Sequence, residues 1–288
     1  MKILILGASG TVGKPLFQTL SGTGAHEVHG TYHRNKPADV LAGRWHPLDI
    51  SDVSGLTHIL KNTAPDLVVS SLNCDFAQQL TLHRHLAQHL QKTGGRMVFV
   101  STANVFDGDV RGQHREGDKP YPISSYGKFK QACETLLQET LGEKCLVIRL
   151  PKVIDEKTAE SFLKQAETGA PPVYENLHMS FNSAQNVASA MAYCIETGKT
   201  GVLHLTSIDA IPISQCMDWL LIQTGKKHGY TPERLTVESF CSALGCDDPG
   251  LLRHNHDGEF HMDLVCTDPD IVTRFGITCE KSVEYLQG

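Results

Sequence analysis

One stretch decides the fold: Lys2-Ile3-Leu4-Ile5-Leu6-Gly7-Ala8-Ser9-Gly10-Thr11-Val12-Gly13. Its first half is a short, uninterrupted apolar run, which is typical of a strand buried in a parallel sheet. Its second half is a glycine turn, and residues 11–20 predict a helix with an apolar face. Three glycines at this spacing allow a sharp turn, close approach to a pyrophosphate, and tight packing of helix on strand. The stretch therefore predicts a dinucleotide-binding turn at a helix N-terminus, with an ordinary strand–helix turn as the alternative.

The alternation of apolar runs and amphipathic helices continues to about residue 150. Further strands are predicted over residues 28–32, 66–71, 96–101 and 145–149, and further helices over 53–62, 76–92 and 124–141. This rhythm predicts a Rossmann-type doubly wound parallel sheet of the α/β class, with helices on both faces.

After residue 150 the pattern loosens. Helices are predicted over residues 157–167, 183–196, 214–224 and 237–243, a strand over 202–205, and a loop over 245–259. We expect a nucleotide-binding Rossmann domain over residues 1–151, completed by 183–206. The remainder of residues 152–288 would form a smaller C-terminal α+β substrate lobe.

The composition is that of an ordinary globular protein. The 288 residues include 26 Lys and Arg against 32 Asp and Glu, a formal charge of −6. This balance argues against a nucleic-acid-binding surface, and no apolar run approaches the roughly 20 residues of a membrane span. The sequence shows no signal-peptide pattern, and its nine cysteines form no C-x-x-C pair. We therefore expect a cytoplasmic protein with reduced thiols.

The end of the second predicted strand bears on the choice of nucleotide. An acidic residue there would bind the ribose 2′-hydroxyl of NAD, whereas this chain has Thr31-Tyr32-His33-Arg34. Arg34 could pair with a 2′-phosphate, assisted by His33 or Lys36, so NADP(H) is favoured over NAD(H). A solvated loop charge is the alternative. Asp49 is expected either to bind the adenine amino group or to cap the helix that follows.

A tyrosine and a lysine stand one helical turn apart, at Tyr126 and Lys130. A phenol has a pKa of about 10, and an ammonium about 4 Å away favours the phenolate by about 4 kcal/mol at an effective dielectric near 20. The pKa of Tyr126 is therefore expected to fall toward neutrality, which suits a proton donor to a carbonyl reduced by hydride.

Thr102 ends the strand that precedes this helix, at the edge where open α/β sheets bind ligands. Its hydroxyl could polarise the same carbonyl. A strand-end hydroxyl that only caps the backbone is the alternative.

Several segments, in order along the chain, resemble the extended short-chain dehydrogenases/reductases, and above all the dTDP-4-dehydrorhamnose reductase family and its sugar-nucleotide relatives. They are the Gly-Ala-Ser-Gly-Thr-Val-Gly turn at 7–13, Pro65-Asp66-Leu67-Val68-Val69, the Ser-Thr-Ala-Asn-Val-Phe-Asp-Gly segment at 101–108, Glu116-Gly117-Asp118-Lys119-Pro120, residues 122–130, and Val147-Ile148-Arg149.

The resemblance implies an NADPH-dependent reductase of a 4-keto sugar nucleotide or similar carbonyl. Thr102, Tyr126 and Lys130 would be its catalytic residues, with Tyr126 as proton donor and Lys130 also on the nicotinamide ribose. The sugar nucleotide would lie between the carboxyl edge of the sheet and the C-terminal lobe. The candidate cofactor contacts are Gly7, Ser9, Gly10, Thr11, Val12, Gly13, His33, Arg34, Asp49, Ser70, Ser71, Leu72, Tyr126 and Lys130.

The chain departs from the family pattern at three places. It has Ser70-Ser71-Leu72 where the family has Asn-Ala-Ala, Ala103-Asn104 where the family has Asp-Tyr, and Gln79 at the position of a supporting Asn. These differences keep two alternatives open: a catalytically weak, NADP-binding regulatory subunit resembling the methionine adenosyltransferase beta subunit, and a sugar-nucleotide epimerase. A dehydratase would need an acidic pair beside Thr102, which Ala103-Asn104 does not supply. A homodimer is also left open.

Two groups of histidines could suggest a metal. The first comprises His254, His256 and His261, with Cys266 nearby. It fits no familiar zinc spacing, so we predict no metal and expect surface or substrate-facing histidines. The second shares one helix and comprises His83, His85 and His89. It lacks the H-E-x-x-H pattern, so a helix-surface or subunit-contact role is expected. Arg149 at a sheet edge could reach a phosphate or form a salt bridge.

Overall fold

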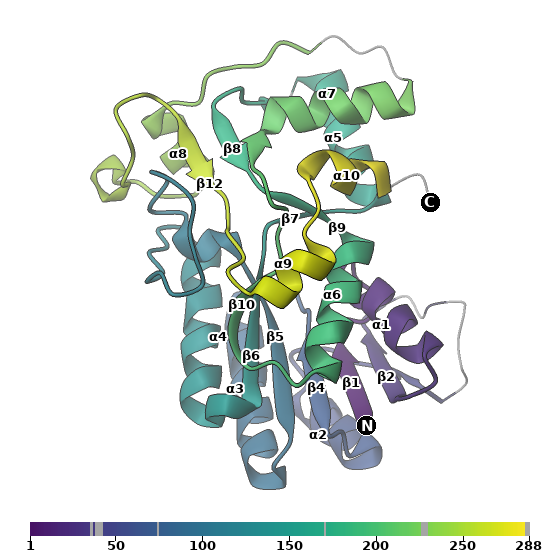
Figure 1. The fold of residues 1–288 in the computed structure, drawn as a ribbon. Coiled ribbons are helices and arrows are strands. Elements are labelled where there is room, and N and C mark those ends of the chain that lie inside the picture. The colour runs from purple at the N-terminus through teal and green to yellow at the C-terminus, as the bar shows by residue number, and fades with distance from the viewer. Residues whose placement is uncertain (35–36, 38–42, 74, 170, 226–229, 286–288) are drawn as a thin grey trace. The chain divides into compact units, whose positions relative to one another are not determined.

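The computed structural model describes residues 1–34, 37, 43–73, 75–169, 171–225 and 230–285. Its central sheet has seven strands in the order β10-β6-β5-β4-β1-β2-β3 (Figure 1). The strands are β1 (Lys2–Leu6), β2 (Glu27–Tyr32), β3 (Trp45–Pro47), β4 (Leu67–Ser70), β5 (Arg96–Thr102), β6 (Cys145–Leu150) and β10 (Gly201–His204). The predicted Rossmann-type parallel sheet is confirmed, and β3 is a strand that the sequence did not reveal.

The strand order reverses beside β1. From β1 the chain moves outward to β2 and β3, then returns to β4 on the other side of β1 and continues to β5. Each neighbouring pair from β3 to β5 is parallel. The carboxyl ends of β1 and β4 therefore meet at a topological switch point, where open α/β sheets bind nucleotides.

Helices cover both faces of this sheet (Figure 1). They are α1 (Gly13–Gly22), α2 (Val53–Thr63), α3 (Phe76–Thr93), α4 (Ser125–Leu141) and α6 (Ala184–Glu196). Helices α2 and α3 share a face, because Thr57 and His85 form a hydrogen bond of 3.0 Å between them. Helices α1 and α6 share the other face, where His26 lies 3.8 Å from Glu196.

Helix α1 begins two residues later than predicted. The prediction placed its start at Thr11, whereas the structure starts it at Gly13 and makes Val12 the N-cap. The glycine turn takes up the intervening residues: Gly7 has a left-handed φ of 77°, and the Gly10 N–H donates to the Gly7 carbonyl at 3.0 Å.

The chain forms two compact units and passes between them several times. Unit 1 comprises residues 1–101, 129–148 and 188–202, and unit 2 comprises residues 102–128, 149–187 and 203–288. The division into domains at residue 151 stays a prediction.

Unit 2 is built from short elements. It has a three-stranded sheet, β11-β8-β12, and a two-stranded sheet, β7-β9. The strands are β7 (Lys152–Ile154), β8 (Leu177–Met179), β9 (Phe181–Ser183), β11 (Ile211–Pro212) and β12 (Phe260–Met262). The helices are α5 (Glu156–Thr168), α7 (Ile213–Thr224), α8 (Val237–Ala243), α9 (Pro269–Phe275) and α10 (Cys279–Glu284). The sequence predicted α5, α7 and α8, and it missed α9, α10 and these strands.

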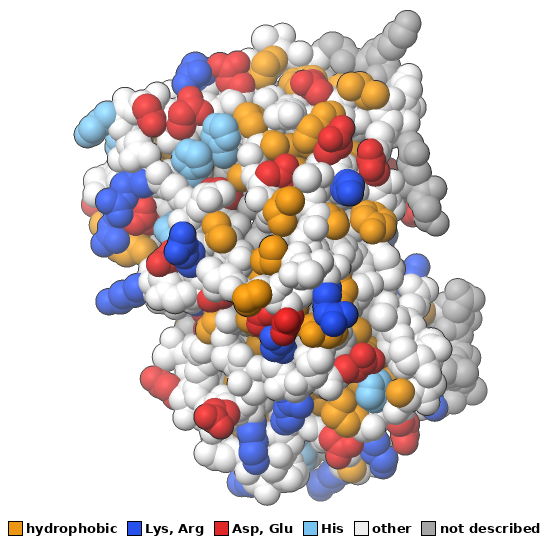
Figure 2. Space-filling model, in the orientation of Figure 1, with side chains coloured by type: hydrophobic (Ala, Val, Ile, Leu, Met, Phe, Trp, Pro, Cys, Tyr) orange, Lys and Arg blue, Asp and Glu red, His pale blue; other side chains and the backbone are white. Residues whose placement is uncertain are grey.

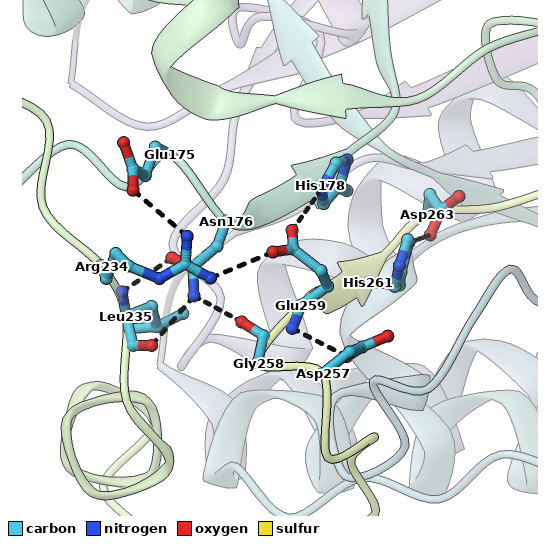
Figure 3. A network of polar contacts seen from close by, with 10 residues as sticks. All are labelled: Glu175, Asn176, His178, Arg234, Leu235, Asp257, Gly258, Glu259, His261 and Asp263. Atoms are coloured by element: carbon cyan, nitrogen blue, oxygen red, sulfur yellow. Dashed lines mark hydrogen bonds and ion pairs between the residues drawn. The ribbon is translucent and has the colours of Figure 1, made fainter.

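A polar network joins β8 and β12 (Figure 3). His178 and His261 are partners in the parallel register, and their rings stack with centroids 4.8 Å apart. The Glu259 carboxylate contacts His178 at 2.8 Å and Arg234 at 3.1 Å. The Asn176 side chain donates to two backbone carbonyls of neighbouring segments. The network therefore ties the segment that precedes β12 to β8 and to residues 234–235.

Figure 2 shows histidine side chains gathered over β8 and β12, amid interspersed acidic and basic groups. The side chain of His261 is 27% exposed, so the prediction of surface histidines holds for this residue. Among the described residues, no group of three or more His, Cys, Asp and Glu side chains is placed to hold a metal ion.

Candidate active site

The glycine turn after β1 is held by the strands on both sides. The Gly7 N–H donates to the Thr31 hydroxyl on β2 at 3.0 Å. The Ser71 hydroxyl, just after β4, lies within donating distance of the carbonyls of Leu6 (3.0 Å) and Gly7 (3.3 Å). The turn is thus fixed at the switch point by side chains of its two neighbours.

Helix α1 begins beside the glycine turn without a side-chain cap. In its first turn the Lys14 N–H donates to the Gly10 carbonyl at 2.9 Å and Pro15 has no N–H, so the positive end of the helix dipole is what this start offers an anion. A Cβ added at Gly13 would lie 2.3 Å from the Gly7 carbonyl oxygen and 2.8 Å from the Ala8 Cα. Only glycine fits there, as expected for a helix packed directly on a phosphate-binding turn.

The residues predicted to contact the nucleotide phosphates are accessible. Ser9 and Gly10 are exposed, and Thr11 and Val12 are partly exposed. His33 and Arg34 are exposed just after β2, whereas Lys36 falls outside the described residues. At the end of β4, Ser71 and Leu72 are partly exposed.

Asp49 does not cap helix α2, which corrects one of its two predicted roles. The cap is Asp52, whose carboxylate accepts from the Gly55 N–H at 2.9 Å. The exposed Asp49 carboxylate instead accepts from the hydroxyl and N–H of Ser51, and these bonds hold the pKa of Asp49 below its ordinary value. Its predicted contact with adenine stays a prediction.

Ser70 points into a buried cluster of unit 1. It is 1% exposed, and its hydroxyl lies 2.8 Å from Nε2 of His83. The ring of His83 meets the ring of Phe99 edge-on at 5.2 Å. Lys130, which is 3% exposed, donates to the Val100 carbonyl at 3.0 Å and lies 5.0 Å over the same Phe99 ring. The prediction of His83 at the helix surface was wrong, because α3 turns this residue toward the sheet.

Burial and the nearby Lys130 lower the pKa of His83 to about 3. Below pH 6.5 the unfolded chain binds a proton that folded His83 does not, so the free energy of unfolding falls as the pH falls. Between pH 6.5 and pH 4 this effect should lower the free energy of unfolding by about 3 kcal/mol.

We expect His83→Gln to be less stable than the wild type at pH 7 but to lose less stability on acidification, as measured by urea unfolding. His58→Gln, at an exposed position, serves as the control, and equal pH slopes for His83→Gln and wild type would contradict the assignment.

Thr102 and Tyr126 both belong to unit 2. Thr102 caps the short 3-10 helix η1 (Ala103–Phe106). Its hydroxyl lies 3.0 Å from Oδ1 of Asn104 and accepts from the Asn104 N–H at 3.3 Å. The backbone cap, which the sequence offered as the alternative role, is therefore present, and the contact of Thr102 with a substrate carbonyl stays a prediction.

The pKa of Tyr126 moves opposite to the prediction. Burial of the side chain raises the pKa of the phenol above its ordinary value. Desolvation of a phenolate costs free energy, which a pairwise estimate of its attraction to Lys130 leaves out. At neutral pH this phenol therefore keeps its proton.

The start of α4 is fixed by a buried carboxylate. Asp107 is fully buried and accepts from the N–H groups of Ile123 (2.7 Å) and Ser124 (3.2 Å) and from the Ser124 hydroxyl. The Ser124 oxygen in turn accepts from the Gly127 N–H at 2.9 Å. A Cβ at Gly127 would lie 2.2 Å from the backbone oxygen of Asn104. The helix start thus packs directly against η1.

Two further charged groups turn inward. Glu134, one turn after the lysine of α4, accepts from the buried Ser101 hydroxyl at 2.5 Å. Glu134 was not predicted as a site residue, although its i+4 spacing from Lys130 was a usable signal. Arg149 is 3% exposed, lies 5.0 Å over the ring of Phe106, and donates to the Glu116 carbonyl at 3.4 Å.

A glycine turn at the switch point of a parallel sheet defines a Rossmann-type α/β protein. Within this class the family can be stated from the sequence itself. The chain belongs to the family described as the RmlD substrate binding domain, which matches residues 1–215.

Three curated relatives illustrate the range of this family. A probable low-salt glycan biosynthesis reductase of Haloferax volcanii is 26% identical over 288 residues, covering 87% of this chain and 95% of that protein. The dTDP-4-dehydrorhamnose reductase of Aggregatibacter actinomycetemcomitans is 28% identical, covering 51% of this chain and 50% of that protein. The methionine adenosyltransferase 2 subunit beta of Bos taurus is 26% identical, covering 54% and 48%. The chain therefore spans about half the length of the last two.

Solved structures share the fold over the whole chain. A dTDP-4-dehydrorhamnose reductase of Clostridium acetobutylicum has a TM-score of 0.76 at 20% identity, with 100% of both chains covered. The reductase of Bacillus anthracis in complex with NADP has a TM-score of 0.75 at 18% identity, covering 100% and 99%. The UDP-glucose 4-epimerase of Thermus thermophilus in complex with NAD has 0.76 at 17%, also covering 100% and 99%. Within the described ranges, no helix is long and apolar enough to cross a membrane.

Proposed function

We propose that the protein is an NADPH-dependent reductase of a 4-keto sugar nucleotide or a similar carbonyl. The observation that carries the proposal is the spacing of Tyr126 and Lys130, one turn apart on α4, together with the burial that raises the pKa of the Tyr126 phenol. A protonated side chain that can reach a carbonyl oxygen is what general acid catalysis requires.

The chain's own residues supply the proton and the orientation. The reduced nicotinamide, when bound, supplies the hydride. Tyr126 gives its proton to the carbonyl oxygen, Thr102 orients that oxygen, and Lys130 holds the nicotinamide ribose. Because burial raises the pKa of Tyr126, the phenol is protonated at neutral pH. A protonated phenol favours reduction over the reverse oxidation.

The glycine turn fits a dinucleotide. The start of α1 would bind the pyrophosphate. Gly13 lets this helix pack directly on the turn, since a Cβ there would lie 2.3 Å from the Gly7 carbonyl oxygen, and the exposed Gly10 allows the close approach. We propose that Arg34, with His33, pairs with the 2′-phosphate of NADP and that Asp49 binds the adenine. Ser71 and Leu72, just after β4, complete the proposed contacts, whereas the hydroxyl of Ser70 is turned away to His83. A homodimer remains a prediction.

A regulatory subunit is the second candidate. The similarity to methionine adenosyltransferase beta subunits favours it, whereas the presence of Tyr126 and Lys130 one turn apart on α4 favours the enzyme.

The test measures NADPH and NADH oxidation with a panel of 4-keto sugar nucleotides, beside fluorescence titration of both cofactors. We expect turnover of at least one substrate and tighter binding of NADPH. Tighter binding of NADH would contradict the role of Arg34. A stable co-purifying partner without turnover of any substrate would favour the regulatory subunit.

A further inference from the structure

Two cysteines lie at the end of helix α8 in unit 2. Cys241 belongs to the last turn of the helix, and Cys246 follows shortly after its end. The Cys246 N–H donates to the Cys241 carbonyl at 2.9 Å, and the Gly245 N–H donates to the Ser242 carbonyl at 3.0 Å. Gly245 has a left-handed φ of 66°. These features define a Schellman motif, and the two cysteines occupy the positions whose side chains commonly pack against each other.

The distance between the two cysteines allows a covalent bond. Standard bond lengths place a Cα about 2.4 Å from its own carbonyl oxygen and about 1.5 Å from its own nitrogen. Together with the hydrogen bond of 2.9 Å between the Cys246 nitrogen and the Cys241 oxygen, they keep the two Cα atoms less than about 7 Å apart. A disulfide can span this distance without movement of the backbone. Both side chains also pack in one hydrophobic cluster with Phe240 and Phe260, so they face the same core.

The two thiols are free and differ in access. Cys241 is 1% exposed, whereas Cys246 is partly exposed. Burial first, and the neighbouring Cys246 thiol next, raise the pKa of Cys241, so little of it is thiolate at neutral pH. The Cys246 sulfur lies 3.5 Å from the backbone oxygen of Asp248, a weak S–H contact that can be given up at little cost. A dissolved reagent therefore meets Cys246 first, and Cys241 lies behind it.

We propose that Cys241 and Cys246 form a dithiol site that a low-molecular-weight disulfide, such as oxidised glutathione, converts reversibly into an intramolecular disulfide. The Cys246 thiolate attacks one sulfur of the reagent, which forms a mixed disulfide and releases one glutathione. Cys241 then loses its proton and attacks the Cys246 sulfur, and the second glutathione leaves. The two cysteines lose two electrons and two protons, and one glutathione disulfide becomes two glutathione thiols. The site does not depend on the proposed reductase.

The position of the pair favours a reversible bond over a structural one. The bond would close a loop of only a few residues, and short loops gain less stability from a disulfide than long ones. It would also be partly exposed, and exposed disulfides are the more readily reduced ones. Disulfides that form in a reducing compartment are usually transient and respond to the redox state. The sequence search for C-x-x-C pairs could not find this site, because its cysteines lie five positions apart.

The test is a map of the cysteines after treatment of the native protein with oxidised glutathione. Remaining thiols are blocked with N-ethylmaleimide, and the tryptic peptides are weighed. The peptide of residues 235–253 carries Cys241 and Cys246 and no other cysteine. We expect it to be unalkylated and lighter by two hydrogen atoms, and we expect dithiothreitol to restore both thiols.

Variants separate the two steps of the exchange. Cys241→Ala should stop the reaction at a glutathione adduct on Cys246. Cys246→Ser should slow the loss of the Cys241 thiol by at least about tenfold, because burial limits both access and thiolate at that residue. Cys266→Ser is the matched control, since Cys266 is also partly exposed, and it should leave the oxidation unchanged.

Three outcomes would overturn the proposal. They are a wild-type peptide that stays fully reduced, one that stops at the glutathione adduct on Cys246 with Cys241 free, and a disulfide from either residue to a cysteine outside the peptide. If Cys241→Ala does not fold, the wild-type map and Cys246→Ser decide the question. Absence of turnover with every carbonyl would refute the proposed reductase and leave this map unaffected.

Discussion

Replacing Tyr126 with phenylalanine should lower the turnover number for a keto sugar nucleotide by about 100- to 10,000-fold, the range that one general acid contributes. The substitution removes the proton donor and leaves the ring, so the packing at the start of α4 and the affinity for NADPH should be retained. Initial rates of NADPH oxidation measure the first effect, and fluorescence titration of the cofactor measures the second.

A matched control is available in Tyr285→Phe. This tyrosine is 52% exposed and should show wild-type rates. If Tyr126→Phe also kept turnover within about twofold of wild type, the phenol would not be the general acid.

Gly13→Ala should raise the Kd for NADPH by about 10- to 100-fold and lower the free energy of unfolding by about 1–3 kcal/mol. The added Cβ would lie 2.3 Å from the Gly7 carbonyl oxygen, so the turn and the start of α1 must move apart. That movement displaces the N–H groups proposed to bind the pyrophosphate. Cofactor titration and urea unfolding measure the two effects.

The other end of the same helix supplies the control. A Cβ at Gly22 would meet nothing within 4 Å, so Gly22→Ala should leave the Kd unchanged and the fold no less stable. Equal affinities for NADPH in Gly13→Ala and Gly22→Ala would show that the turn does not hold the cofactor.

Elements that carry several complete periods could be predicted from the sequence. Strand β1 was predicted with the bounds observed, Lys2–Leu6, because a buried apolar run ends abruptly at a glycine. Strand β11, Ile211–Pro212, consists of only two residues, so alternation cannot show in it. Such short strands of unit 2 become visible only through their pairing with strands distant in the sequence.

In the candidate site, too, the features set by local spacing could be predicted and those set by packing could not. The spacing of Tyr126 and Lys130 and the position of Thr102 at a strand end were readable, since they depend on local geometry. The direction that His83 faces and the sign of the pKa shift at Tyr126 were not. Both depend on burial, which is set by how α3 and α4 pack. An estimate of the attraction between two charged side chains does not include burial.

The hydrogen bonds at the N–H and the carbonyl of Gly7 also affect the free energy of coenzyme binding. The freedom of this loop is lost when the protein folds, so a dinucleotide meets a preorganised cradle and loses little entropy in ordering it. Retention of the coenzyme then depends also on the hydroxyls of Thr31 and Ser71, because they hold the turn in place. Substitutions of Thr31 or Ser71 should therefore weaken the binding of the coenzyme and leave the rate of the chemical step unchanged.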